Sequence, residues 1–110
     1  MLATGSVLKN IPEALEGEQF QDLLRGQGFR VERIVSQGYC SPQGFWYQQV
    51  ESEWVLVIEG AAKLLFEDGT VHAMTRGDYV LIPAGVRHRV EWTDPAHPTV
   101  WLAIHFPTSS

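Results

Sequence analysis

The chain has 110 residues, the size of one folding domain, and its 45% hydrophobic and 19% charged residues are typical of a globular protein rather than a disordered one. The formal net charge of −5 argues against nucleic acid as a partner, because such binding needs clustered lysines and arginines. With one cysteine, the chain can form no internal disulfide and no cysteine-based zinc site.

No segment of the sequence is expected to meet a membrane. The longest apolar run, Val55–Ile58, is far too short to span a bilayer. The segment Met1–Asn10 lacks the basic region and long apolar core of a signal peptide. We therefore expect a cytoplasmic protein without membrane partners.

The first element in chain order is a helix, predicted within residues 13–25. Pro12 suits a first helical turn, and Gly26 can end a helix. Because Gly17 weakens the first part, we expect a short helix around Gln19–Arg25. The apolar positions of the whole segment are Leu15, Phe20, Leu23 and Leu24.

From residue 30 onward the pattern changes to short runs of β-type residues between turns that contain glycine and proline. This pattern predicts an all-β sandwich or barrel, and eight strands are the number found in a jelly roll. The predicted strands are Arg30–Ser36, Phe45–Val50, Trp54–Glu59, Ala62–Phe66, Val71–Ala73, Tyr79–Ile82, His88–Trp92 and Val100–Phe106.

Alternation along the strands predicts which side chains share a face, because successive residues point to opposite sides. In the strand from residue 88, His88, Val90 and Trp92 share the apolar face. The segment 53–58 is apolar on both faces, with Trp54, Leu56 and Ile58 on one of them. One face then packs in the barrel, and the other is covered by the N-terminal helix or by a second subunit. If a second subunit covers it, a two-fold homodimer is the expected form, and we expect a homodimer.

The segment 77–88 carries a motif of fixed spacing. Gly77, Pro83, Gly85 and His88 stand at the required positions of the second cupin motif, G(X)5PXG(X)2H(X)3N, and Trp92 stands where that motif has asparagine. The chain therefore resembles the cupin superfamily. The resemblance implies a single domain over residues 1–110, with an N-terminal arm and short helix at 1–29 and a jelly-roll β-barrel at 30–106.

The first cupin motif, G(X)5HXH(X)3-4E(X)6G, is matched only in its second half, by Glu53 and Gly60. Its two histidine positions are occupied by Tyr47 and Gln49 in one register, or by Trp46 and Gln48 in the other. The segments at 44–47 and 99–103 also resemble a group of small single-domain bacterial cupins, most of which lack an assigned activity. The resemblance therefore implies a fold more firmly than a function.

Cupins with complete motifs hold a divalent metal with three histidines and a glutamate, so the resemblance implies a metal inside the barrel. The candidate ligands here are Gln49, Glu53 and His88, and also His105 if the last strand turns that side chain inward, which alternation leaves open. Two alternatives follow: one divalent transition metal, Zn, Fe, Mn or Ni, is bound, or none is bound and Glu53 and His88 pair with each other or with a ligand.

Three functions remain open at this point. The first is a barrel that binds a small molecule without an assigned activity. The second is a metal-dependent oxygenase or isomerase of a small organic substrate, in which Glu53 and His88 are the catalytic residues. The third is a structural dimer without a functional pocket. The residues expected to line the pocket beside that pair are Tyr47, Gln49, Val55, Val57, Val90 and Trp92.

Overall fold

The computed structural model describes residues 2–13, 15 and 17–107, and this part of the chain forms eight β-strands and no helix. It therefore contains no helix that could cross a membrane. The strands are β1 (Glu18–Gly26), β2 (Phe29–Ser36), β3 (Ser52–Glu59), β4 (Ala61–Phe66), β5 (Val71–Thr75), β6 (Tyr79–Ile82), β7 (His88–Thr93) and β8 (Thr99–Phe106).

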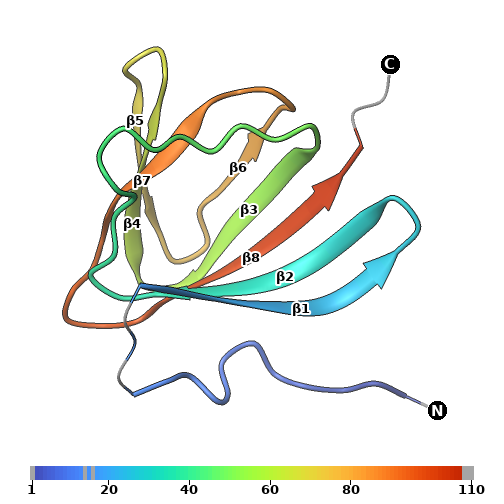
Figure 1. Cartoon of the computed structure of the whole chain (residues 1–110). Helices are drawn as coiled ribbons and strands as arrows, with labels where there is room; N and C mark the ends of the chain where they lie inside the picture. The colour runs from blue at the N-terminus through green and yellow to red at the C-terminus, as the bar shows by residue number, and fades with distance from the viewer. Residues whose placement is uncertain (1, 14, 16, 108–110) are drawn as a thin grey trace.

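The strands form two antiparallel sheets of a jelly roll. The larger sheet has the order β1-β2-β8-β3-β6, and the smaller one has the order β5-β4-β7. Figure 1 shows the long strands β1, β2, β8 and β3 side by side, with β4, β5 and β7 standing opposite them. β2 and β3 both pair with β8, so the middle of the larger sheet joins segments that are far apart in the sequence.

The hydrophobic core lies between the two sheets. On β3, Val55 and Val57 point inward and are 4% and 0% exposed, whereas Trp54 and Leu56 alternate to the outer face and are only partly buried. Burial of each such valine contributes about 1.5–3 kcal/mol. The buried cluster consists of Ile34, Val55, Val57, Ala62, Leu64, Met74, Ile82, Val90, Trp101 and Ala103.

The predicted N-terminal helix is wrong, because residues 18–26 form strand β1. β1 pairs with β2 along its whole length, and the two strands are joined at a turn where Gly28 has a φ of 81°. Pairing with β2 satisfies the backbone groups that the helix would otherwise have bonded internally. Ala14 and Glu16, in the first part of the expected helical segment, lie outside the described residues.

The predicted strand Phe45–Val50 is also wrong, because this segment meets its neighbour at a single isolated bridge between Tyr47 and His88. Ser41 contacts Val90 on the same strand, through a hydrogen bond from its N–H to the Val90 carbonyl. Six residues of the loop thus correspond to two residues of β7, so no continuous ladder can form. The loop nevertheless runs along the edge of β7, and this course places its side chains beside His88.

Candidate functional site

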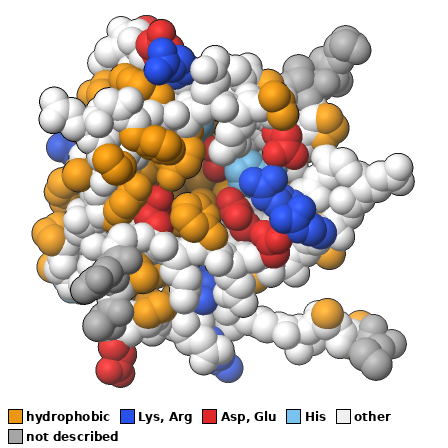
Figure 2. Space-filling view, viewed as in Figure 1, with side chains coloured by type: hydrophobic (Ala, Val, Ile, Leu, Met, Phe, Trp, Pro, Cys, Tyr) orange, Lys and Arg blue, Asp and Glu red, His pale blue; other side chains and the backbone are white. Residues whose placement is uncertain are grey.

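A cavity of about 60 Å³ opens into the space between the two sheets. In Figure 2 it appears as a central hollow, with hydrophobic side chains on one side and a group of acidic, histidine and basic side chains on the other. Its volume is enough for about four to six water molecules, or a small organic molecule. The lining residues are Glu18, Phe20, Glu32, Ile34, Tyr47, Gln49, Glu53, Val55, Leu64, Ile82, His88, Val90, Trp101 and His105.

The turn before β7 places His88 in this cavity. Gly85 has a φ of 81°, a left-handed conformation that glycine adopts without strain, and its N–H donates to the Gln49 carbonyl at 2.8 Å. The backbones of Tyr47 and His88 then exchange two hydrogen bonds, of 2.7 and 3.0 Å. The glycine of the sequence motif therefore joins the loop that carries Tyr47 and Gln49 to the strand that carries His88.

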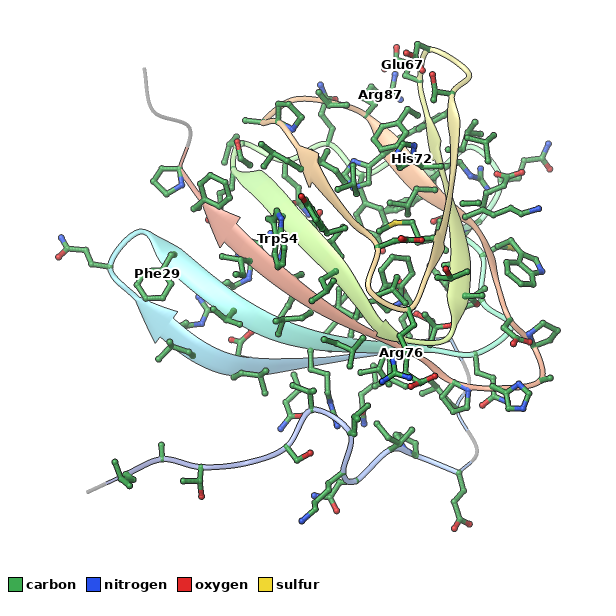
Figure 3. The ribbon with its side chains drawn as sticks, turned by 180° about the vertical axis from the view of Figure 1, so that it is seen from behind. Phe29, Trp54, Glu67, His72, Arg76 and Arg87 are labelled. Carbon is green, nitrogen blue, oxygen red and sulfur yellow. The ribbon has the colours of Figure 1, made fainter. Side chains whose placement is uncertain are left out.

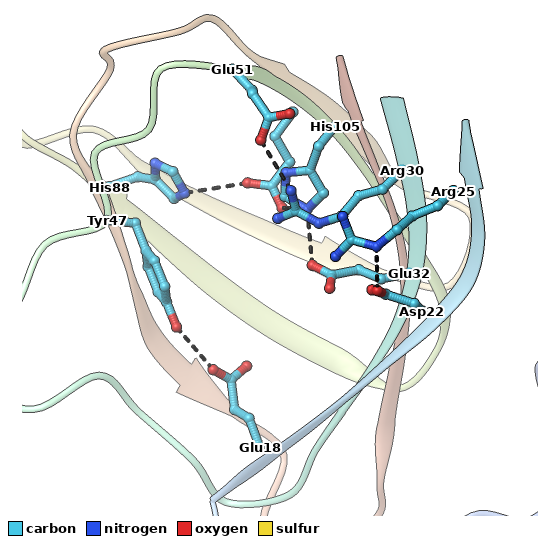
Figure 4. A network of polar contacts seen from close by, with 10 residues as sticks. Glu18, Asp22, Arg25, Arg30, Glu32, Tyr47, Glu51, His88 and His105 are labelled. Carbon is cyan, nitrogen blue, oxygen red and sulfur yellow. Dashed lines mark hydrogen bonds and ion pairs between the residues drawn. The ribbon is translucent and has the colours of Figure 1, made fainter. Parts of the chain in front are cut away.

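The ring of His88 lies between a backbone carbonyl and Glu53. Its Nδ1 is 3.1 Å from the Val86 carbonyl oxygen, and its Nε2 is 3.6 Å from Glu53 Oε1 (Figure 4). A carbonyl oxygen can only accept, so Nδ1 carries the hydrogen, and in the neutral ring Nε2 is an acceptor. Two acceptors therefore face each other in the cavity unless a proton or a ligand stands between them.

His105 lies in the lumen, which resolves the orientation that alternation left open. It is 1% exposed, and its Nε2 is 2.8 Å from Glu32 Oε1 and 3.8 Å from Glu53 Oε2. The Nε2–H donates to Glu32, because a carboxylate only accepts. The Nδ1 atom of His105 and the Oε1 atom of Gln49 are buried without a hydrogen-bond partner in the described part of the chain.

A second polar network closes the other side of the cavity. The Tyr47 hydroxyl and the Ser36 hydroxyl each donate to a different oxygen of Glu18, both at 3.1 Å, and the Trp101 indole donates to Ser36 at 3.2 Å. Burial raises the pKa of the Glu18 carboxyl, and the nearby Glu53 carboxylate adds to the shift. Burial also raises the pKa of the Tyr47 phenol, so this group remains a donor at neutral pH.

The residues expected to form the site are only partly brought together. Tyr47, Gln49, Val55 and Val90 line the cavity together with Glu53, His88 and His105. Val57 lies in the hydrophobic core and is not among the residues that line the cavity. Trp92 lies on the surface, 40% exposed, because the register of β7 against β4 shifts between its pairings with Lys63 and Leu64 and interrupts simple alternation.

Sequence reasoning missed Glu18 and Glu32. Glu18 precedes a segment whose sequence predicts a helix, and a helical pattern does not indicate on which face of a sheet Glu18 lies. Glu32 shares a face of β2 with Ile34, whereas Val31 and Val35 are on the opposite face and make that side the more apolar one. Pairing with Ala103 of β8, which is itself inward, fixes the orientation of Glu32. Only that long-range pairing could have identified it.

The donors in the cavity do not fit the transition-metal site that the family implies. Among the described residues, no three His, Cys, Asp or Glu side chains are placed to hold one ion. His105 Nε2 is hydrogen-bonded to Glu32, and the first motif supplies a phenol and an amide in place of two imidazoles. Amide oxygen and phenol are poorer donors to such metals than imidazole, and Glu53 and His88 alone make an incomplete set.

Comparison with known proteins agrees with the architecture. The chain is 42% identical to a Ralstonia eutropha JMP134 protein that has been assigned provisionally as a mannose-6-phosphate isomerase; the alignment covers 97% of this chain and 100% of that one, with a TM-score of 0.94. No curated protein matches the sequence significantly.

More distant structures share the fold alone. An RmlC-like cupin protein of Desulfovibrio desulfuricans is 14% identical, with coverage of 97% and 98% and a TM-score of 0.74. A conserved Streptococcus pyogenes protein of unknown function is 12% identical, with coverage of 100% and 91% and a TM-score of 0.77. The sequence model of the cupin domain matches residues 37–105, more than half of the sequence, and the chain therefore belongs to the cupin family.

Proposed function

We propose that this protein binds a small organic molecule in the lumen of the barrel, with a polar end of the ligand between Glu53 and His88. The observation that supports this most strongly is the buried pair of Glu53 Oε1 and His88 Nε2, which face each other beside an open space at 3.6 Å, too long for a hydrogen bond. An unsatisfied buried polar group costs about 1–3 kcal/mol. A ligand that hydrogen-bonds to both atoms removes this cost.

The rest of the cavity wall favours an apolar body on the ligand. Seven of the lining residues are hydrophobic, and their side chains come from both sheets: Phe20, Ile34, Val55, Leu64, Ile82, Val90 and Trp101. A mostly apolar wall with a few convergent polar groups is typical of small-molecule sites. Burial of about 100 Å² of apolar ligand surface would contribute about 2.5 kcal/mol.

Filling the cavity tests this proposal. Val90 is 7% exposed and lines the lumen, so Val90→Phe should occupy part of the ligand volume. Val71, on β5, is 50% exposed and provides a matched surface control, Val71→Phe. A panel of small neutral, cationic and anionic compounds is screened by ligand-observed NMR. Binding should be retained in Val71→Phe and lost in Val90→Phe. Equal binding to both variants, or no binding to the wild type, would contradict the proposal.

An isomerase is the second candidate, because a carboxylate and an imidazole in one apolar lumen are suited to proton transfer. The 42% identical protein carries a provisional assignment of this kind, for mannose 6-phosphate. In this candidate, Glu53 takes a proton from one substrate carbon and returns it to the neighbouring carbon, and His88 Nε2 accepts a hydrogen bond from a substrate hydroxyl. The test is turnover of mannose 6-phosphate by the wild type, with loss of at least about a hundredfold in Glu53→Gln. Absence of turnover in the wild type would reject this substrate.

A further inference from the structure

In the described part of the lumen, most hydrogen-bond donors already have an acceptor, whereas several acceptors have no donor. The donors are already engaged: the Tyr47 hydroxyl by Glu18, the Trp101 indole by Ser36, and the His105 Nε2–H by Glu32. His88 Nδ1–H is engaged by the Val86 carbonyl. Apart from the Gln49 amide, which can both donate and accept, the groups that remain for a ligand are acceptors.

The free acceptors belong to three side chains of the cavity lining, those of Glu53, His88 and Gln49. Glu53 is 8% exposed, and among the described residues its oxygens face His88 Nε2 at 3.6 Å and His105 Nε2 at 3.8 Å. His88, which is 6% exposed, offers Nε2, and Gln49 offers an Oε1 that has no partner among the described residues. A ligand that fits this arrangement brings several hydrogens on one polar atom.

The charge of the lining points the same way. Three carboxyl groups, from Glu18, Glu32 and Glu53, line the cavity, and no lysine or arginine is among its described lining residues. The arginines nearby are already paired, Arg30 with Glu51 at 3.0 Å and Arg25 with Asp22 at 2.8 Å (Figure 4). An anionic group such as a phosphate would enter an acidic, donor-poor site with no free cation to bind it.

We infer that the ligand of this lumen is a small organic cation, an alkylammonium whose three N–H groups meet Glu53, His88 and Gln49 and whose apolar body contacts the hydrophobic wall. This inference rests on the proposed function, and it adds the ligand class. The cavity of about 60 Å³ favours a small ligand. A phosphorylated sugar, in contrast, is anionic and needs hydrogen-bond donors for its phosphate, whereas the lumen is acidic and its donors are already engaged.

Three compounds that share a cyclopentyl ring and differ in the charge of its substituent test the charge preference: cyclopentylamine, cyclopentanol and cyclopentanecarboxylate. Titration calorimetry is carried out on the full chain at neutral pH, once with excess chelator and once with added Zn²⁺. The amine should bind at least about tenfold more tightly than the alcohol, and the carboxylate should not bind. The order of affinities, amine above alcohol above carboxylate, should be the same with excess chelator as with added Zn²⁺. Equal affinity for amine and alcohol, preference for the carboxylate, or amine binding that requires Zn²⁺ would each overturn the inference.

Glu53→Gln removes one lumen charge while keeping the shape of the side chain, and Glu59→Gln removes one charge from an exposed strand end. Amine affinity should fall at least about tenfold in Glu53→Gln and remain unchanged in Glu59→Gln. Equal effects of the two substitutions would also overturn the inference. If none of the three compounds binds, the cationic ligand is rejected, whereas the broader panel with Val90→Phe decides the proposed function separately.

Discussion

Glu18 is held in the lumen by two hydroxyl donors, yet its pKa is raised, since burial outweighs those hydrogen bonds. A carboxyl whose pKa is higher in the folded chain than the ordinary 4.5 binds its proton more tightly after folding. Its contribution to stability is therefore fully present below that value. The contribution is lost as the pH rises through the folded-state pKa.

We predict that Glu18→Gln removes this pH dependence. The difference in melting temperature, variant minus wild type, should become more positive as the pH rises from about 4 to about 8, because only the wild type must ionise a buried carboxyl. Thermal unfolding followed by circular dichroism measures it, with Glu59→Gln as the exposed control. A difference that stays constant or decreases with pH would show that Glu18 is not destabilised in its ionised form.

The residues of the site were predictable to unequal degrees. His88 could be placed in the lumen from the motif and from alternation, because both are local properties of the sequence. Glu53 followed from the second half of the first motif. Glu18 and Glu32 could not be found, because their orientations depend on the pairing of β1 with β2 and of β2 with β8. No short-range pattern carries that information.

At the scale of the elements, the strands from residue 29 onward follow the predicted ranges closely. Tyr79–Ile82 has the predicted bounds, and the others differ by one or two residues. Glycine and proline residues lie in the turns between these strands, so the local sequence indicates where each strand ends. The two failures, at 19–25 and 45–50, are both at the edge of a sheet. There, long-range pairing with β2 and the single bridge to β7 decide the structure.

The turn between β3 and β4 requires glycine for two reasons. Gly60 has a φ of 105°, and a Cβ there would lie 2.6 Å from the Cα of buried Thr99. Gly69, with a φ of 92° and open space around it, shares only the first constraint. We predict that Gly60→Ala lowers the free energy of unfolding by about 3 kcal/mol or more and Gly69→Ala by about 1–2 kcal/mol.

Urea unfolding of the two variants measures this difference. The larger loss should be in Gly60→Ala, because β8 carries Thr99 and cannot move away without disturbing its pairing with β3. Similar losses in the two variants would mean that the backbone conformation alone, and not the close approach to Thr99, accounts for the cost.

At the scale of the whole molecule, the larger sheet carries large apolar side chains on its outer face, at β3 and β6. Figure 3 shows Trp54 on the side of β3 seen from behind, and its ring lies 5.5 Å from that of Tyr79. Tyr79 and Leu81, on β6, are 64% and 54% exposed. The homodimer remains a prediction, with this face as the contact between two copies.

Sedimentation equilibrium at micromolar concentration tests the predicted dimer. The wild type should sediment as a dimer, and Leu81→Asp should shift it towards monomer, because burial of an unpaired carboxylate in an apolar contact is unfavourable. The exposed substitution Val71→Asp, on β5 of the smaller sheet, serves as the control and should remain dimeric. A monomeric wild type would contradict the prediction.

The central claim, that the lumen beside Glu53 and His88 is the ligand site, is tested most directly by the ¹⁵N resonances of the four imidazole rings. His88 and His105 line the cavity, whereas His72 and His97 lie on the surface and act as internal controls. Addition of the small-molecule ligand should shift the signals of His88 and His105 and leave those of His72 and His97 unchanged. Shifts confined to His72 or His97, or no shift at saturating ligand, would contradict the claim.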